Sequence, residues 1–144
     1  MIDKVAQTEY KDLMLVWESS VKSTHHFLTN EDFKFYKKLI PSFFENVILH
    51  GIKNDKQKIV GFIGTDKENL EMLFVSENNI GKGFGKQLLI YAIEHLNIKK
   101  VEVNKDNLKA VDFYKHFNFK TKSISEVDGF GKPYPILHME LEKN

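Results

Sequence analysis

The apolar residues change their spacing several times along this chain, and the order of those changes restricts the folds it can adopt. Residues 8–28 and the stretch that follows up to residue 44 have helical spacing, whereas residues 46–75 contain three short apolar runs typical of strands. Further strand and helix patterns alternate towards the C-terminal end. The predicted order is β-α-α-β-β-β-α-β-α-β-β, which indicates an α/β fold with a mixed sheet and helices on its faces.

Local signals predict where several of these elements end. Thr29 or Asn30 is expected to cap the second helix, and Pro41 is expected to kink or restart it because proline lacks a donor N–H. The polar segment 54–57 predicts a turn between two strands, and residues 128–129 predict the turn of a second hairpin. The other predicted strands and helices are Asn46–Lys53, Lys58–Thr65, Leu70–Val75, a helix opened by residues 81–85, Val101–Asn104, a helix from Asn107, and a hairpin over Phe119–Leu141.

The composition excludes several classes of protein. The chain has 144 residues, which is typical of one domain spanning residues 1–144 with a core that needs no metal or disulfide. Its 21 cationic residues are all lysines and oppose 20 acidic ones, and the net charge of +1 argues against a dedicated nucleic-acid or membrane-surface protein. The absence of cysteine excludes a disulfide framework and a cysteine nucleophile, and the histidines lack metal-ligand spacing, so no metal is expected. No signal peptide or long apolar run is present, so we expect a soluble cytoplasmic protein.

Three glycines at alternate positions, Gly81, Gly83 and Gly85, separate a predicted strand from an amphipathic helix. Glycine allows the backbone to approach a ligand closely, and a helix N-terminus offers N–H groups and the positive end of the helix dipole, so a phosphate or another anion is expected there. The spacing fits neither a Walker A loop, which needs Ser or Thr after Lys86, nor the dinucleotide pattern G-x-G-x-x-G. An ordinary glycine-rich turn is the alternative.

Two motifs carry a resemblance to a known family. Ile80–Gly85 resembles the acyl-CoA loop of the GNAT N-acetyltransferases, usually Arg/Gln-x-x-Gly-x-Gly/Ala, with isoleucine at the usual Arg/Gln position. The segment from Asn107 to Phe119 resembles the family's N-x-x-A-x-x-F-Y-x-x-x-G-F, with Asn118 in place of the glycine, and asparagine is the next best residue for a left-handed helix end. The resemblance covers nearly the whole chain, and both ends are similar to a bacterial branch, the YjaB-type acetyltransferases.

This resemblance implies the GNAT fold, with a mixed, mostly antiparallel sheet and helices on both faces. It implies that the protein moves an acetyl group from acetyl-CoA to a primary amine, on a small molecule or on a peptide or protein, by direct attack in a ternary complex. In this family acyl-CoA lies between the fourth and fifth strands, and fourth-strand backbone groups hold the pantetheine arm and polarise the thioester carbonyl. The residues expected to contact the cofactor are Leu73, Phe74, Val75, Gly81, Lys82, Gly83, Phe84, Gly85, Lys86, Asn104 and Asn107.

Tyr114 is the residue that the resemblance assigns to catalysis. A phenol with a pKa near ~10 can return a proton to the departing CoA thiolate. A tyrosine packed on the apolar face of its helix is the alternative. Asn107 could cap that helix or contact the pantetheine.

The general base is left open by the sequence. Glu71 stands two residues after Asn69, which occupies the position of a glutamate in the histone-acetylating relatives, and so is expected on the same strand face. His25 is a second candidate for the base and for binding the acceptor, and it could equally be a cation at a helix C-terminus. A water chain is a third possibility. Tyr134, between two prolines, is expected to project from the last hairpin beside the acceptor, or to be a structural aromatic at a turn.

Two other functions are consistent with parts of the sequence. A non-catalytic module that senses acyl-CoA would explain Ile80 and the missing fourth-strand glutamate, although Tyr114 argues against it. Nucleic-acid binding is disfavoured by the near-zero net charge. Because the chain has no arginine, backbone N–H groups of residues 81–86 are expected to be the main anion site, with Lys82 and Lys86 in support. The protein is expected to be a monomer or a homodimer.

Overall fold

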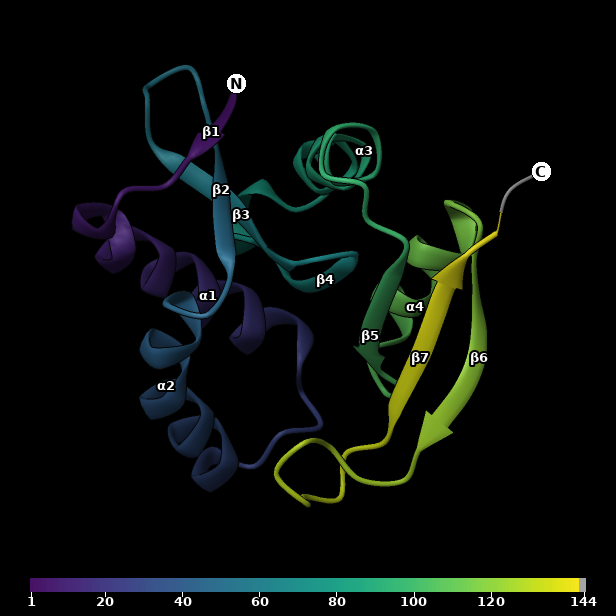
Figure 1. Ribbon diagram of the computed structural model, residues 1–144. Coiled ribbons are helices and arrows are strands. Elements are labelled where there is room, and N and C mark those ends of the chain that lie inside the picture. Colours follow the sequence, from purple (N-terminus) through teal and green to yellow (C-terminus); the bar gives the residue numbers. More distant parts are fainter. Residues whose placement is uncertain (143–144) are drawn as a thin grey trace. The chain divides into compact units, whose positions relative to one another are not determined.

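The computed structural model describes residues 1–142 and divides into two compact units, Met1–Ile98 and Lys99–Asn144 (Figure 1). In the first unit, neighbouring antiparallel strands follow the order β1 (Ile2–Lys4), β2 (Ile48–Lys53), β3 (Ile59–Asp66) and β4 (Asn69–Val75). In the second, β7 (Ile136–Leu141) lies between β5 (Lys100–Asn104) and β6 (Phe119–Ser125), again antiparallel. The helices are α1 (Tyr10–Thr24), α2 (Asn30–Phe44), α3 (Phe84–His95) and α4 (Leu108–His116), with short 3-10 turns at Gln7–Glu9 and Glu77–Asn79. The predicted order of elements is confirmed.

The helices of the first unit cover both faces of its sheet (Figure 1). Adjacent residues of a strand point to opposite faces, so Phe62 and Gly61 of β3 meet different helices. Phe62 is fully buried on the face of α1 and α2, where its ring lies edge-on to Phe44 at 5.8 Å. On the other face Gly61 allows α3 to pack closely, because a Cβ there would lie 3.1 Å from Leu88 Cδ1. The first unit is therefore a layered α/β structure with apolar cores on both sides of the sheet.

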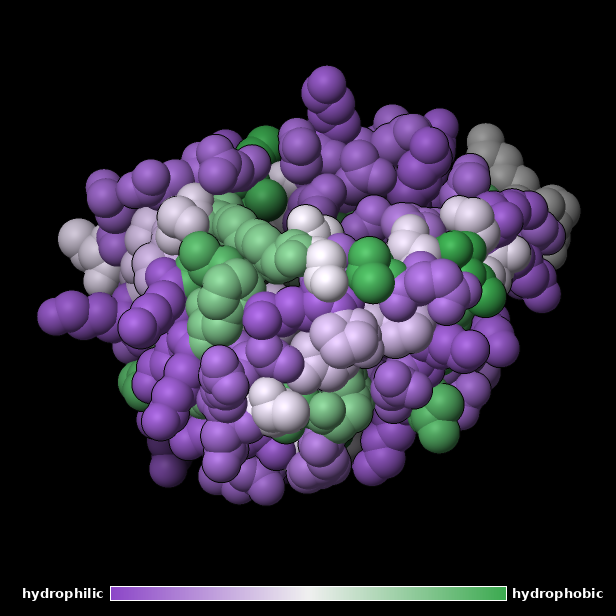
Figure 2. Space-filling model, turned by 90° about the horizontal axis from the view of Figure 1, so that it is seen from below, coloured by the Kyte–Doolittle hydropathy of each residue, from purple (hydrophilic) through white to green (hydrophobic). Residues whose placement is uncertain are grey.

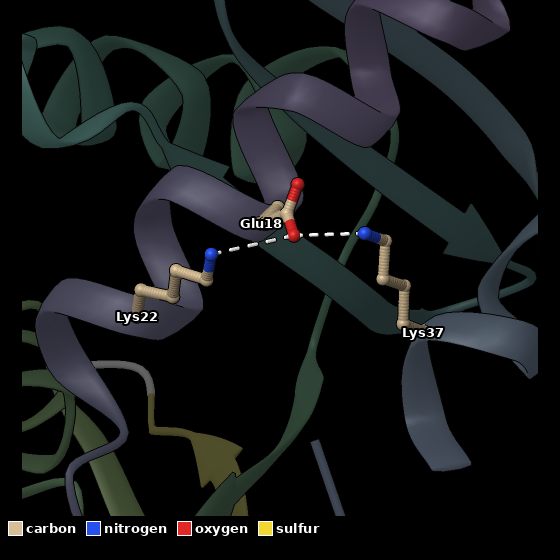
Figure 3. Close-up of polar contacts among 3 residues, drawn as sticks. All are labelled: Glu18, Lys22 and Lys37. Carbon is tan, nitrogen blue, oxygen red and sulfur yellow. Dashed lines mark hydrogen bonds and ion pairs between the residues drawn. The ribbon is translucent and has the colours of Figure 1, made fainter. Parts of the chain in front are cut away.

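A small ion-pair cluster joins α1 to α2. The Glu18 Oε1 atom lies 2.8 Å from Lys37 Nζ and 3.5 Å from Lys22 Nζ (Figure 3). These contacts, led by the hydrogen bond from Lys37, hold the pKa of Glu18 below its usual value. The lysines are largely exposed, and such surface pairs contribute only about 0–1 kcal/mol each. The two helices are thus held together mainly by apolar contacts such as the Trp17–Phe33 stack, with 5.4 Å between ring centroids.

The second helix begins where the sequence predicts. Thr29 is the N-cap of α2, and its Oγ1 atom accepts a hydrogen bond from the Asp32 N–H at 3.1 Å. The predicted restart at Pro41 is wrong, because α2 continues through it to Phe44. Proline removes one backbone donor, but a helix whose apolar face packs on a core can tolerate that loss.

Side-chain hydrogen bonds also order the turn between β2 and β3. Asn54 Oδ1 accepts hydrogen bonds from the N–H groups of Lys56 and Lys58, both at 3.0 Å. Gln57 takes the left-handed conformation, with φ of 63°. The predicted turn over residues 54–57 is confirmed.

The second unit is a three-stranded sheet with α4 against it. Phe119 of β6 is fully buried and meets the Tyr114 ring of α4 at 5.7 Å. Asn118, which ends this helix region, has φ of 75°, and its N–H donates to the Lys115 carbonyl at 3.1 Å. The predicted left-handed asparagine is therefore confirmed.

Hydrophobic side chains reach the surface in small groups. On the face drawn in Figure 2, green hydrophobic side chains are interrupted by purple hydrophilic ones. Within residues 1–142, no helix combines the length and the apolar character that a membrane crossing requires.

Candidate active-site residues

The glycine loop leads into α3 with an uncapped helix N-terminus. Gly81 and Gly83 have φ of 86° and 88°, and Gly83 is the N-cap residue, which has no side chain to accept a hydrogen bond. Gln87 N–H makes the first helical hydrogen bond, to the Gly83 carbonyl at 3.1 Å. The N–H groups of the first helical turn, from Phe84 onward, therefore have no intrahelical acceptor.

The donors at this loop fit a phosphate group. No heavy atom lies within 4 Å of a Cβ built on Gly81 or Gly83, so the loop is open on its outer side. Lys82 and Lys86 are exposed, and neither forms an ion pair with any residue in the described part of the chain. Backbone N–H groups, the helix dipole and two mobile ammonium groups together suit an anion. Gly81 and Gly83 thus have backbone conformations that favour glycine, and the role of the loop in holding a ligand stays a prediction.

Leu73, Phe74 and Val75 lie on β4 as predicted, and the pairing of that strand is irregular at Glu71. The register with β3 steps from Met72 to Leu70, so Glu71 is the extra residue of a β-bulge. A bulge alters side-chain directions locally, so the expected shared face of Asn69 and Glu71 stays a prediction. Glu71 is exposed on the surface of the first unit.

His25 ends α1 and is held by several contacts. Its N–H donates to the Val21 carbonyl at 2.8 Å, its Nδ1 lies 2.7 Å from Thr24 Oγ1, and its ring is 5.2 Å from the Phe27 ring. Burial, and then the charge of His26, lower the pKa of His25 from 6.5 to about 4. A pKa this low favours the neutral imidazole at pH 7 and argues against the predicted alternative of a cation at the helix C-terminus.

Tyr114 is buried in the second unit, with 6% of its surface exposed. Its ring packs against the Phe113 ring at 5.3 Å and the Phe119 ring at 5.7 Å. Burial raises the pKa of the Tyr114 phenol above the usual 10.0 of tyrosine. The phenol is thus protonated at physiological pH, and its raised pKa makes it a weaker acid than an exposed tyrosine.

Asn107 is the N-cap of α4. Its Oδ1 atom accepts a hydrogen bond from the Ala110 N–H at 3.3 Å, which supports the capping alternative. This leaves the Nδ2 group as a donor toward other partners. Asn104 is the last residue of β5, and its carbonyl accepts the Asn107 N–H at 3.0 Å, so the two asparagines form one turn.

Tyr134 does not project from the last hairpin as predicted. It is buried, with 8% of its surface exposed. The loop before it is ordered by Asp128, whose Oδ1 atom accepts the N–H groups of Phe130 at 2.9 Å and Lys132 at 3.0 Å. Side-chain hydrogen bonds and burial within the loop favour the structural interpretation of Tyr134.

The predicted site residues are divided between the two units. The first unit carries the glycine loop, the β4 residues and His25, and the second carries Asn104, Asn107, Tyr114 and Tyr134. Thr24 is not among the predicted site residues, yet it contacts His25, and its Oγ1 atom also lies 2.7 Å from the Ser20 carbonyl oxygen. The available signal was a Thr directly before the His at a predicted helix end, since Ser and Thr often bond to the carbonyl four residues earlier. Within residues 1–142, no three His, Asp or Glu side chains come together as a metal site would require.

The chain is similar in sequence to named acetyltransferases. A family model described as an acetyltransferase (GNAT) domain matches residues 23–143. The peptidyl-lysine N-acetyltransferase YjaB of Salmonella typhimurium is 35% identical over 131 residues, which cover 91% of this chain and 90% of that protein. The Escherichia coli protein of the same name is 34% identical, over 91% of this chain and 89% of that protein.

Solved structures show the same fold. The solution structure of apo-form YjaB from Escherichia coli matches with a TM-score of 0.91 and 32% identity, covering 100% of this chain and 98% of that one. The PaiA N-acetyltransferase of Thermoplasma acidophilum, in complex with coenzyme A, matches with a TM-score of 0.70 and 21% identity, covering 97% and 98%. The predicted mixed, mostly antiparallel GNAT fold is confirmed. The chain belongs to the GNAT acetyltransferase family.

Proposed function

We propose that this protein transfers the acetyl group of acetyl-CoA to a primary amine, and that the amine is a lysine side chain of a peptide or protein. The observation that carries the proposal is the open N-terminus of α3 at Gly83, in a chain of this enzyme family. The lysine acceptor is suggested by the relatives named peptidyl-lysine N-acetyltransferases.

The cofactor's phosphates are assigned to the glycine loop. The backbone N–H groups of Gly81–Lys86 donate to the pyrophosphate, and Lys82 and Lys86 add a screened attraction. The backbone of Leu73, Phe74 and Val75 is assigned to the pantetheine arm and the thioester carbonyl. Asn104 and Asn107 Nδ2 are assigned supporting contacts to the same cofactor.

Tyr114 is assigned the role of general acid. The amine nitrogen attacks the thioester carbon, the C–S bond breaks, and the sulfur leaves with the bonding electrons. The Tyr114 hydroxyl supplies the proton that makes this sulfur a neutral thiol, and the proton that the nitrogen loses as it becomes an amide returns the phenolate to its neutral form. The assignment is supported by the position of Tyr114 in the family motif; the raised pKa keeps the phenol protonated but makes it a weaker acid until the thiolate lies beside it.

The acceptor arrives as an ammonium and must lose a proton before it attacks. His25 is poorly suited to keep that proton, because its pKa is lowered to about 4. As a neutral imidazole it is better suited to accept a hydrogen bond from the amine and orient it. Of the two predicted bases, the exposed carboxylate of Glu71 is therefore the one we assign to proton removal.

We also propose that residues 1–144 act as one catalytic domain. The family model extends from residue 23 to residue 143, and the match to apo-form YjaB covers 100% of the chain. Neither match ends at the border between the two units.

A thermal-shift titration followed by a thiol-release assay tests the proposal. Acetyl-CoA at 100 times its Kd is expected to stabilise the folded state by about 2.7 kcal/mol. Thiol should then be released from acetyl-CoA faster with lysine-containing peptides as acceptors than with free polyamines or amino acids at equal concentration. Binding without release on any amine would instead support a non-catalytic acyl-CoA sensor, and no thermal shift at millimolar acetyl-CoA would refute the cofactor assignment.

A further inference from the structure

Three polar groups meet at the last turn of α1. Thr24 Oγ1 lies 2.7 Å from the Ser20 carbonyl oxygen and 2.7 Å from His25 Nδ1. The threonine hydroxyl has one hydrogen, and a carbonyl oxygen can only accept. That hydrogen is therefore directed at Ser20, so Thr24 Oγ1 must act as the acceptor in its contact with the imidazole.

This arrangement selects one tautomer of His25. Because Thr24 Oγ1 accepts, the Nδ1 atom of the ring carries the hydrogen, and in a neutral imidazole Nε2 then carries the lone pair. The ring is neutral at pH 7, since burial and the charge of His26 lower the pKa of His25 to about 4. Nε2 accepts no hydrogen bond from any side chain or backbone group among residues 1–142.

The surroundings also hold the ring in place. The His25 N–H is bonded to the Val21 carbonyl at 2.8 Å, and the His25 carbonyl accepts the Leu28 N–H at 3.1 Å. The Phe27 ring lies 5.2 Å away, and the His25 side chain is half-buried. A ring fixed by its backbone, its neighbour and Thr24 has little rotational freedom left to lose when a partner binds to Nε2.

We propose that Thr24 is a positioning residue that holds His25 in its Nδ1–H tautomer and thereby presents the Nε2 lone pair to the N–H of the acceptor amine. The role of Thr24 and His25 at the acceptor amine rests on the proposed acetyltransferase function, whereas the assignment of the His25 tautomer does not. The ligand recognised at Nε2 is a primary amine that donates a hydrogen.

The tautomer is measured by long-range proton–nitrogen NMR spectra of the 15N-labelled full chain, with the His25 signals identified from a His25→Gln variant. The wild type is expected to show a protonated Nδ1 and an unprotonated Nε2. Thr24→Val keeps the shape but removes the hydroxyl, and should give a mixture of tautomers or the reverse one, whereas Thr24→Ser should retain the wild-type pattern. An Nε2–H tautomer in the wild type, or an unchanged pattern in Thr24→Val, would overturn the assignment.

Ser23→Ala is the matched control. Ser23 Oγ also donates to the Ser20 carbonyl, at 2.9 Å, but has no contact with the imidazole. Its loss should leave the His25 spectrum unchanged while removing a comparable hydrogen bond from the helix end. A tautomer change in Ser23→Ala would mean that the helix end in general, and not the Thr24 hydroxyl, sets the ring.

Steady-state kinetics test the role at the acceptor. Thr24→Val is expected to raise the KM for the amine about fivefold, the effect of losing one oriented neutral hydrogen bond, with the KM for acetyl-CoA unchanged and with recovery in Thr24→Ser. Unchanged kinetics in a Thr24→Val protein with an altered tautomer would overturn the acceptor role. If the wild type acetylates no amine, the proposed function fails and the acceptor role fails with it, while the spectra still decide the tautomer.

Discussion

Two helix N-termini carry residues assigned to the cofactor, and they differ in whether a side chain caps them. The helix α3 begins at Gly83, a left-handed residue with no side chain to cap the first turn. The helix α4 begins at Asn107, whose side chain accepts the Ala110 N–H at 3.3 Å. The first-turn N–H groups of α3 have no side-chain acceptor, whereas one such group of α4 is bonded to the Asn107 side chain.

The roles proposed for the two ends also differ, because α3 is assigned to binding and α4 to chemistry. At α3 the proposed ligand groups are backbone N–H groups, so the conformation of the glycines is expected to matter more than any side chain. At α4 the proposed group is one buried side chain, Tyr114, on the helix that the Asn107 cap begins. Substitutions at the two ends should therefore change different measured quantities.

The largest expected effect is on turnover at α4. Tyr114→Phe removes the proposed proton donor but keeps the ring packing, so kcat should fall about 10²–10⁴-fold while the Kd for acetyl-CoA stays constant. Thiol release and calorimetric titration measure the two quantities, and Tyr91→Phe on α3 is the matched control, expected to have wild-type kcat. Because the pKa of Tyr114 is raised above 10.0, rising pH should cause no loss of kcat from its ionisation below pH 10. Unchanged kcat in Tyr114→Phe would contradict the general-acid role.

The next largest effect is on binding at α3. Gly83 has φ of 88°, a conformation that costs an L-residue roughly 1–2 kcal/mol and a β-branched one more. Gly83→Val should therefore weaken acetyl-CoA binding about tenfold or more, as measured by calorimetry. Gly83→Asn adds a side chain of comparable size that tolerates the left-handed region, and it should lose much less. Equal losses in the two variants would indicate that bulk, and not backbone conformation, is what the site cannot accept.

A smaller effect on stability is expected at the cap of α4. Asn107→Ala should lower the free energy of unfolding by about 1 kcal/mol, because the Ala110 N–H loses its acceptor. Asn107→Asp retains a capping oxygen and should restore the stability seen in thermal unfolding. If Asn107→Asp is stable but binds acetyl-CoA more weakly, the Nδ2 group contacts the cofactor as well, and the internal cap is only part of its role.

The smallest effect is expected from the lysine in the glycine loop. Lys82 is exposed, and an exposed charge is screened by salt. Lys82→Ala should raise the Kd for acetyl-CoA only about twofold at physiological salt, a change equivalent to about 0.4 kcal/mol. A loss larger than that of Gly83→Val would mean that charge, and not the uncapped helix end, holds the cofactor.

Much of the fold was predictable because it depends on short-range signals. The Thr29 cap, the turn over residues 54–57 and the left-handed Asn118 each depend on residues within four positions of one another. The glycine loop and the spacing between Asn107 and Tyr114 could also be recognised in the sequence, since both are local patterns. These features follow from the conformational preferences of particular residues and from hydrogen bonds to the nearest backbone groups.

The features that were predicted wrongly or not predicted at all depend on contacts between segments distant in sequence. The bulge at Glu71 arises from its register with β3, and the burial of Tyr134 depends on the packing around its loop. The continuous helix through Pro41 depends on the core that its apolar face covers. Sequence periodicity contains no information about these partners.

The sequence by itself determined the order of elements, the two GNAT motifs and the absence of arginine, and these lead to the proposal of an anion site built from backbone N–H groups. Only the tertiary structure decided the state of His25. Burial of its ring lowers the pKa to about 4, and the Thr24 hydroxyl, already committed to Ser20, determines which ring nitrogen carries the hydrogen. The protonation state of an imidazole depends on the dielectric and the donors around it, and only the folded chain supplies both.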